Sequence, residues 1–320
     1  MEYITLGKTQ SKVSKISLGT WSYGGASTSG NQSVGWADQE DSDSKKALLK
    51  AYDLGINHWD TADVYGDGRS ESIIGKMWKE VSRNEIFLAT KVGWDMGSYD
   101  HWYHPSKMIE NMERSLNNLN TECVDLMYLH HCNFGKNEEF FDDALDVLTK
   151  FLESGKTKFI GLSDWSDKKI MQYIDRVSPD VVQPYRNVMD DSYEISGLKN
   201  YIDSNNVGVC FFSPIKHGLL TGKYKKPPKF KDGDYRKNVE AFNNQEIIDL
   251  LLMNKEKLSD RFSNHSQPVM HGLISPILED APTGCVLLGQ RNEEQVVKAS
   301  QLGDGISKED AEWVKKLYKI

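Results

Sequence analysis

Eight short apolar segments with strand-like sequence recur along the chain, and each is followed by a stretch of helical character. Consecutive strands that are joined by helices run parallel, because each return to the same edge of the sheet needs a long crossover. Eight such units in one chain predict a closed (β/α)8 barrel. The segments are ISLGT (16–20), INHWD (56–60), IFLATK (86–91), VDLMYLH (124–130), FIGLS (159–163), DVVQP (180–184), VGVCFFSP (207–214) and GCVLLG (284–289).

The segments between the strands carry helix signals. In DSDSKKALLKAYDLG (41–55), acids and serines stand at the start, apolar residues follow at helical spacing, and Gly55 marks the stop. The opening YITLGKTQSKVS predicts a β-hairpin. The fold class is therefore α/β: a TIM barrel with an N-terminal hairpin and a C-terminal helix. Further helices are expected at 70–81, about 105–118, 139–154, 166–176, 193–205, 244–262, 292–302 and in the tail KEDAEWVKKLYKI.

An open, doubly wound sheet is the alternative architecture. Such a sheet usually carries GxGxxG after its first strand, and ISLGTWSYGG does not match that pattern. No linker interrupts the 320 residues, so one domain spanning 1–320 is expected. Two long loops, 27–44 after the first strand and 225–238 after the seventh, lie where barrels place loops that cover their sites.

Charge and cysteine content narrow the class of protein. The formal net charge of −8 gives no electrostatic basis for binding nucleic acid or an anionic membrane. Four scattered cysteines without a CxxC predict neither structural disulfides nor a metal cluster. The first residues lack the features of a signal peptide, and no apolar run is long enough to span a bilayer. A cytoplasmic location is expected, and the oligomeric state stays open.

Polar residues follow several of the predicted strands, at the end of the barrel where active sites form. Asp60 ends the second strand and Tyr65 comes shortly after it; Lys91 ends the third, and His130 ends the fourth. Any one of these residues alone could be a solvated turn or a structural side chain. An acid, a tyrosine, a lysine and a histidine at three neighbouring strand ends indicate a site for acid–base chemistry.

Eight fragments in order resemble the aldo-keto reductase superfamily: GINHWDTADVYG, ATKVG, VDLMYLHH, GLSDWS, VVQPYRN, FFSPIKHGLLTGKY and VLLGQRNEEQ, together with the N-terminal hairpin. The resemblance implies a barrel that binds a nicotinamide cofactor and reduces carbonyl compounds. It assigns the catalytic tetrad to Asp60, Tyr65, Lys91 and His130. His130 is preferred to its neighbour His131, which is expected at the rim of the pocket because successive strand residues face opposite ways.

The chemistry of carbonyl reduction suits these four residue types. Hydride addition builds negative charge on the carbonyl oxygen, which then needs a proton donor. Tyr65 would donate that proton, and a nearby Lys91 would lower the tyrosine pKa. Asp60 would hold and balance Lys91, and His130 would orient the carbonyl by a second hydrogen bond.

The resemblance also places a cofactor site. NADPH is expected rather than NADH, because Arg291 would pair with a 2′-phosphate. Asp164 replaces the usual asparagine beside the nicotinamide carboxamide. It is expected to favour the oxidised cofactor; the alternative is a tolerated near-isostere without that effect. Lys298 and Ala299 depart from the usual adenine contacts. The predicted cofactor residues are Gly19, Thr20, Trp21, Ser163, Asp164, Gln183, Phe212, Ser213, Pro214, Ile215, Lys216, Gly218, Lys223, Gly289, Arg291 and Gln295.

The predicted substrate pocket consists of Tyr23, Trp94, His131 and Trp165, which suits small or medium carbonyl compounds. Two rival functions come from other classes of protein. A regulatory subunit, like the aldo-keto reductase-like β subunits of potassium channels, would retain the same site with little turnover. A metal-dependent barrel hydrolase would need an HxH motif near the first strand, and ISLGTW has none.

Overall fold

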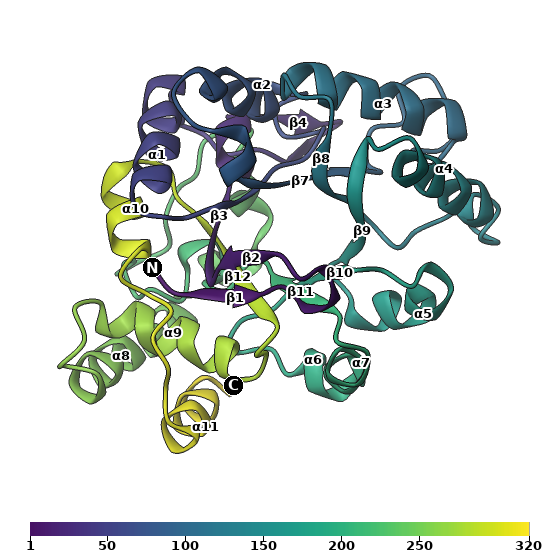
Figure 1. Cartoon of the computed structure of the whole chain (residues 1–320). Helices are drawn as coiled ribbons and strands as arrows, with labels where there is room; N and C mark the ends of the chain where they lie inside the picture. Colours follow the sequence, from purple (N-terminus) through teal and green to yellow (C-terminus); the bar gives the residue numbers. More distant parts are fainter. Residues whose placement is uncertain (320) are drawn as a thin grey trace.

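Eight parallel strands close into a barrel in a computed structural model that describes residues 1–319 (Figure 1). Each strand pairs with the next in the chain, and the last pairs with the first. The predicted fold class is thus confirmed, whereas Ile320, the end of the expected domain, lies outside the described residues. The strands are β3 (Ile16–Gly19), β6 (His58–Asp60), β7 (Phe87–Val92), β8 (Val124–Leu129), β9 (Thr157–Asp164), β10 (Val181–Pro184), β11 (Gly208–Phe211) and β12 (Gly284–Gly289).

Helices surround the barrel and bury their apolar faces against the outside of the strands (Figure 1). None of the helices within residues 1–319 combines the length and apolar character that crossing a membrane requires. They are α1 (Asp41–Asp53), α2 (Arg69–Gly75), α3 (Pro105–Asn118), α4 (Phe141–Glu153), α5 (Asp167–Val177), α6 (Ser192–Ile195), α7 (Leu198–Asn205), α8 (Gln245–Arg261), α9 (Pro268–Glu279), α10 (Glu293–Ala299) and α11 (Lys308–Tyr318).

Two of the expected helices are interrupted. The 70–81 helix changes to a 3₁₀ turn after Gly75, whose Cα packs so closely on α3 that a Cβ would lie 2.2 Å from the Asn118 carbonyl oxygen. The 193–205 helix breaks at Gly197, which has a φ of 85°.

The N-terminal end of the barrel is closed by the predicted hairpin, β1 (Tyr3–Thr5) and β2 (Lys12–Ser14), which lies across it in Figure 1. Leu6 and Val13 from the hairpin region are fully buried in a cluster with the inward side chains of the barrel. These side chains recur at every second strand position: Phe87, Ala89, Leu126, Tyr128, Val181, Cys210, Cys285 and Leu287.

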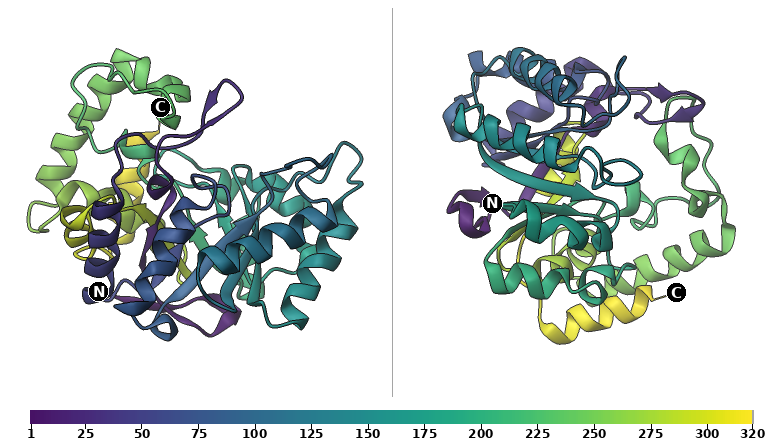
Figure 2. Two further views of the ribbon diagram at one scale, coloured as in Figure 1. Left: turned by 90° about the horizontal axis from the view of Figure 1, so that it is seen from above. Right: turned by 90° about the vertical axis from the view of Figure 1, so that its right-hand side faces the viewer.

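At the opposite end, the two long loops meet each other instead of forming separate covers. The first contains a small hairpin, β4 (Thr28–Ser29) with β5 (Gln32–Ser33), that reaches toward the second loop (Figure 2). Gly35 forms a β-bridge with Asp234, and the Asp234 carboxylate accepts a hydrogen bond from Ala37 N at 3.2 Å. We call residues 25–39 together with 231–238 the loop bridge.

Candidate active site

Three of the four predicted catalytic residues follow the inward alternation of their strands. Lys91 continues the inward positions of β7, and Asp60 stands two residues after the buried His58 of β6. His130 directly follows β8 and continues the inward series of Leu126 and Tyr128. These side chains therefore meet at the C-terminal end of the barrel, as the sequence analysis expected.

Lys91 is the centre of the group. Its ammonium is almost completely buried and donates to Asp60 Oδ1 at 2.5 Å and to the Thr61 carbonyl oxygen at 2.6 Å. The same nitrogen lies 3.4 Å from the Tyr65 hydroxyl. Asp60 Oδ2 accepts a second hydrogen bond from the Gln183 amide at 2.8 Å. The carboxylate thus fixes the ammonium, and the ammonium faces the phenol.

Burial and charge act in opposite directions on this pair. Burial alone would lower the pKa of Lys91, but Asp60 and Tyr65 outweigh it, so the net shift is upward and the amine stays charged. Burial raises the pKa of Tyr65, and the opposing effect of Lys91 is smaller, so the tyrosine pKa ends above its ordinary value. The predicted direction of the Lys91 effect is present, but burial outweighs it.

His130 is placed as a neutral hydrogen-bonding group. Burial, with smaller contributions from His131 and Lys91, lowers its pKa well below the ordinary value. The ring lies edge-on to Tyr65, with centroids 6.0 Å apart, and stacks on His131 at 4.9 Å. Its buried Nδ1 has no hydrogen-bond partner within residues 1–319. A neutral imidazole beside the phenol can hydrogen-bond a ligand oxygen.

Asp164 has a different environment from the one expected. Its two carboxylate oxygens accept hydrogen bonds from the backbone N–H groups of Cys132 and Ser166, each at 2.8 Å. An asparagine could supply only one such acceptor and would turn its NH₂ toward the other donor. The structure therefore gives Asp164 a local role that joins the ends of β8 and β9, next to Ser163.

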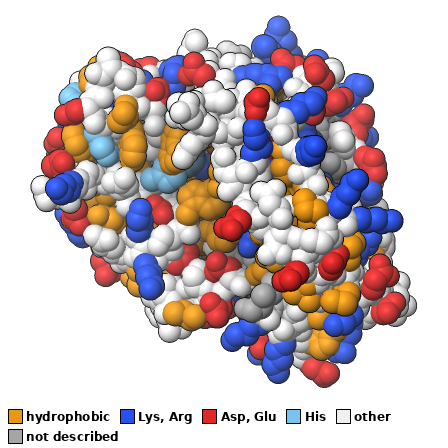
Figure 3. All heavy atoms as spheres, turned by 180° about the vertical axis from the view of Figure 1, so that it is seen from behind, with side chains coloured by type: hydrophobic (Ala, Val, Ile, Leu, Met, Phe, Trp, Pro, Cys, Tyr) orange, Lys and Arg blue, Asp and Glu red, His pale blue; other side chains and the backbone are white. Residues whose placement is uncertain are grey.

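Aromatic rings crowd the mouth of the barrel above the tetrad. Trp21 stacks on Tyr65, with ring centroids 6.1 Å apart. Its ring centroid also lies 5.7 Å from that of Trp36 and 5.0 Å from that of Tyr235. On the far side, Trp165 packs edge-to-face on Phe212 at 4.8 Å. Seen from the side opposite the N-terminal hairpin, hydrophobic and histidine side chains gather at the surface between charged ones (Figure 3).

Two further rings belong to this cluster, Tyr235 and His217; His217 was expected only in the diphosphate-binding segment, and Tyr235 was not predicted. The His217 ring lies 5.1 Å from Tyr235, and burial lowers its pKa to about 4. His217 lies in the 3₁₀ turn after β11, and Tyr235 begins a 3₁₀ turn in the second long loop. Because such short turns carry no periodic pattern, the aromatic ring itself was the only signal.

The segment after β11 is a tight turn with several residues in the left-handed region of backbone conformation. Ser213, Lys216, His217 and Gly218 all have positive φ, and the N–H groups of Lys216 and Gly218 donate to the carbonyl oxygens of Ser213 and Ile215 within the turn. The Lys223 ammonium lies close to Gly218, 3.5 Å from where a Cβ would stand. These features fit the diphosphate of a dinucleotide, the role that the resemblance gave to this segment, including Pro214 and Ile215.

The predicted adenosine end is occupied by protein contacts. The Arg291 guanidinium donates to Gln39 Oε1 at 2.8 Å and to the carbonyl oxygens of Ala37 and Asp38 at 2.7 and 2.6 Å. Gln295 accepts from Arg291 N at 2.9 Å. Arg291 therefore attaches the loop bridge to the end of β12. Only the guanidinium N–H groups that take no part in these hydrogen bonds could reach a 2′-phosphate. Lys298 pairs with Glu294 at 2.5 Å.

The remaining predicted residues divide into two groups. Trp94 lies beside the tetrad. Its ring centroid is 4.2 Å from that of His131 and 6.3 Å from that of His130. Tyr23 does not lie beside the tetrad: it is fully buried, and its hydroxyl donates to the Gln290 carbonyl oxygen at 2.7 Å. Thr20 is also buried and donates to the Asp60 carbonyl oxygen. Gly19 and Gly289 pair across the seam between the first and last strands.

Comparisons with known proteins agree with this geometry. The model of the aldo/keto reductase family matches residues 15–318. The chain is 28% identical over 308 residues to aldo-keto reductase YhdN of Bacillus subtilis, covering 94% of this chain and 88% of that protein. It is 26% identical over 331 residues to a probable voltage-gated potassium channel subunit beta of Oryza sativa subsp. japonica, covering 100% and 96%.

Among solved structures, the glycerol dehydrogenase of Gluconobacter oxydans superposes with a TM-score of 0.80 at 25% identity, covering 98% of this chain and 94% of that one. The family match extends over nearly the whole barrel, and relatives named as reductases or dehydrogenases align along almost their full lengths. The chain belongs to the aldo/keto reductase family and is an oxidoreductase that uses a nicotinamide cofactor.

Proposed function

We propose that this protein reduces aldehydes and ketones with NADPH, reversibly, and that Tyr65 is the general acid. The observation that carries the proposal is the position of the Lys91 ammonium. It lies 2.5 Å from Asp60 and 3.4 Å from the Tyr65 hydroxyl, at the end of the barrel where family members act.

The proposed mechanism assigns one task to each side chain. When bound, the nicotinamide supplies a hydride to the carbonyl carbon. Tyr65 gives its proton to the carbonyl oxygen as negative charge develops there, and Lys91 stabilises the phenolate that remains. Asp60 and Gln183 keep Lys91 in place through the contacts described above. His130, held neutral by burial, donates a second hydrogen bond to the same oxygen.

The cofactor residues stay those predicted from the resemblance. Phe212 and Ser213 follow β11, and Ser163 and Gln183 stand at neighbouring strand ends, which supports a nicotinamide site next to the tetrad. The positive-φ segment with Lys223 would hold the diphosphate. Arg291, at the outer end, would favour NADPH over NADH.

Replacing Tyr65 by phenylalanine tests the acid. We expect Tyr65→Phe to lower kcat by about 10²–10³, the usual cost of one donor to a developing oxyanion. NADPH binding, followed by cofactor fluorescence, should not change, because the phenol contacts the substrate oxygen. A variant with wild-type kcat would contradict the assignment, and so would a wild type that binds NADPH but turns over no aldehyde or ketone.

Arg291 tests the choice of cofactor. We expect Arg291→Met to raise the KM for NADPH about tenfold, the cost of about one charged hydrogen bond to phosphate, with a smaller rise for NADH. The KM for NADH should rise because the variant also loses the hydrogen bonds to Ala37 and Asp38 in the loop bridge. Equal increases for both cofactors would assign Arg291 to the loop bridge alone and contradict its role in selecting NADPH.

A further inference from the structure

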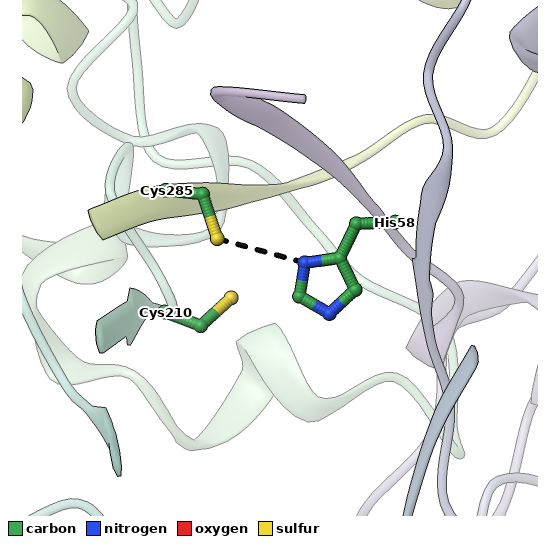
Figure 4. A group of neighbouring side chains, drawn as sticks. All are labelled: His58, Cys210 and Cys285. Carbon is green, nitrogen blue, oxygen red and sulfur yellow. Dashed lines mark hydrogen bonds between the residues drawn. The ribbon is translucent and has the colours of Figure 1, made fainter. Parts of the chain in front are cut away.

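Three side chains with metal-binding atoms meet inside the barrel, below the tetrad. His58 from β6, Cys210 from β11 and Cys285 from β12 point toward one another in Figure 4. Their nitrogen and sulfur atoms all lie within 4.8 Å of one another, and all three residues are fully buried. His58 Nδ1 lies 3.5 Å from Cys285 Sγ. The mechanism proposed above uses none of these side chains.

The 3.5 Å separation is that of a hydrogen bond between the thiol and the imidazole, and it equals the separation expected for two ligands of one metal ion. Zinc bonds of about 2.3 Å to sulfur and about 2.0–2.1 Å to nitrogen, at a tetrahedral angle, place the two ligand atoms about 3.5 Å apart. Ser17 Oγ is hydrogen-bonded to the same His58 Nδ1 at 2.9 Å, so a bound ion would replace this hydrogen bond and leave the hydroxyl oxygen free for a fourth position. Cys210 and Cys285 are register partners on adjacent parallel strands, which brings their side chains to the same level of the barrel.

Charge balance selects the ion. The site is fully buried, and the nearest strand position above it holds the mutually neutralising Asp60–Lys91 pair. Two thiolates and Zn²⁺ sum to zero charge, whereas two thiolates and Cu⁺ leave one uncompensated negative charge in a buried setting, which is costly. The geometry points to a structural Zn²⁺ site formed by His58, Cys210 and Cys285, with Ser17 completing it.

The four residues also explain what such an ion would do. They lie on β11, β12, β3 and β6, four consecutive strands that include the seam where the last strand pairs with the first. The ion would therefore fasten the C-terminal strands to the N-terminal ones. Leu6 and Val13 close that end of the barrel, so the ion enters while the chain folds, and two thiol protons are released to solvent.

Metal content tests the proposal. Protein produced in zinc-supplemented medium and purified without chelator should contain about one zinc per chain by mass spectrometry of the elements. Cys210→Ala and Cys285→Ala should each lose at least about nine-tenths of it. Cys132→Ala is the matched control, because Cys132 is equally buried but lies outside the cluster, and its zinc content should equal that of the wild type.

A second measurement covers variants that fail to fold. Wild-type protein unfolded and then refolded with Cd²⁺ should acquire the ultraviolet absorption of cadmium–thiolate bonds, at about one ion per chain. Three results would overturn the proposal: refolded wild type with less than about a tenth of an ion per chain, copper in place of zinc, or a Cys210–Cys285 disulfide found by thiol titration of denatured protein.

Discussion

Asp63 stands three residues after Asp60 in the same motif, but the two carboxylates have opposite surroundings. Asp60 accepts from Lys91 and Gln183, whereas both oxygens of the buried Asp63 lack a hydrogen-bond partner within residues 1–319. Burial, and next the nearby Glu71, raise the pKa of Asp63 to about 8. A buried acid that stays protonated at neutral pH costs stability as the pH rises.

Asp63→Asn should therefore stabilise the protein in a pH-dependent way. The folded pKa lies above the unfolded value of about 3.9, so the native state binds the extra proton and stability falls as the pH rises between the two values. We expect the variant to gain on the order of 1–3 kcal/mol at about pH 8 and nothing near pH 4. Urea denaturation at both pH values measures the difference.

Asp67 provides the matched control for this substitution. It lies in the same turn, but its side chain is 87% exposed and pairs with Arg114 at 3.0 Å. Asp67→Asn should change stability by less than about 0.5 kcal/mol at either pH. A wild type that is more stable than Asp63→Asn at about pH 8 would show that Asp63 is ionised and stabilising in the native state.

At the scale of elements, Tyr65, the proposed general acid, is positioned by a backbone-to-backbone contact. The 3₁₀ turn after β3 ends at Gly24, where a Cβ would lie 2.6 Å from Tyr65 C and Gly66 N. Gly24 has no positive φ, so its requirement is for space alone. We expect Gly24→Ala to displace Tyr65 and lower kcat about 10²-fold, with a loss of about 1–3 kcal/mol in stability.

The comparison variant is Gly305→Ala, because a Cβ at Gly305 would meet no atom within 4 Å and the residue has no positive φ. Its kcat and unfolding midpoint should match those of the wild type. Steady-state kinetics on both variants test whether the close approach of Gly24 positions Tyr65. If Gly24→Ala keeps the wild-type kcat, this contact does not position the Tyr65 hydroxyl.

The elements also show where sequence patterns stop being informative. Every barrel strand was predicted from its apolar run, because each is buried on both faces. The α9 helix was missed, since it has Pro268 at its start, Pro276 inside it and few polar residues to define a face. Its helical form depends on packing against α8 and α11, which no local pattern contains.

At the scale of the whole molecule, contacts between segments that are far apart along the chain could not be predicted from the sequence. The tetrad was predicted because strand ends in a barrel meet by rule. Arg291, by contrast, contacts residues about 250 positions away in the loop bridge. Scattered cysteines argued against a metal cluster, yet closure of the barrel brings Cys210 and Cys285 beside His58. Spacing along the chain says little about residues that a closed sheet makes neighbours.

The loop bridge crosses the mouth over the proposed cofactor site, so its stability should set the rate of cofactor release. Asp234 holds it: its carboxylate accepts from Ala37 N and pairs with Arg236 at 2.6 Å, and that guanidinium lies 4.7 Å over the Trp36 ring. Asp234→Ala removes the contact to Ala37 and leaves Arg236 unpaired. We expect NADPH to dissociate about tenfold faster, because one or two hydrogen bonds are lost.

Asp232→Ala is the control for this experiment. Asp232 carries the same charge two residues earlier, but its side chain is 95% exposed and pairs only with Lys237, a neighbour on the same loop. Stopped-flow fluorescence of bound NADPH measures both dissociation rates, and Asp232→Ala should release the cofactor at the wild-type rate. Because Asp234 touches no member of the tetrad, the chemical step in single-turnover experiments should be unchanged in both variants. If the two variants release NADPH equally fast, the bridge does not retain the cofactor, and release depends on the aromatic cluster beneath it.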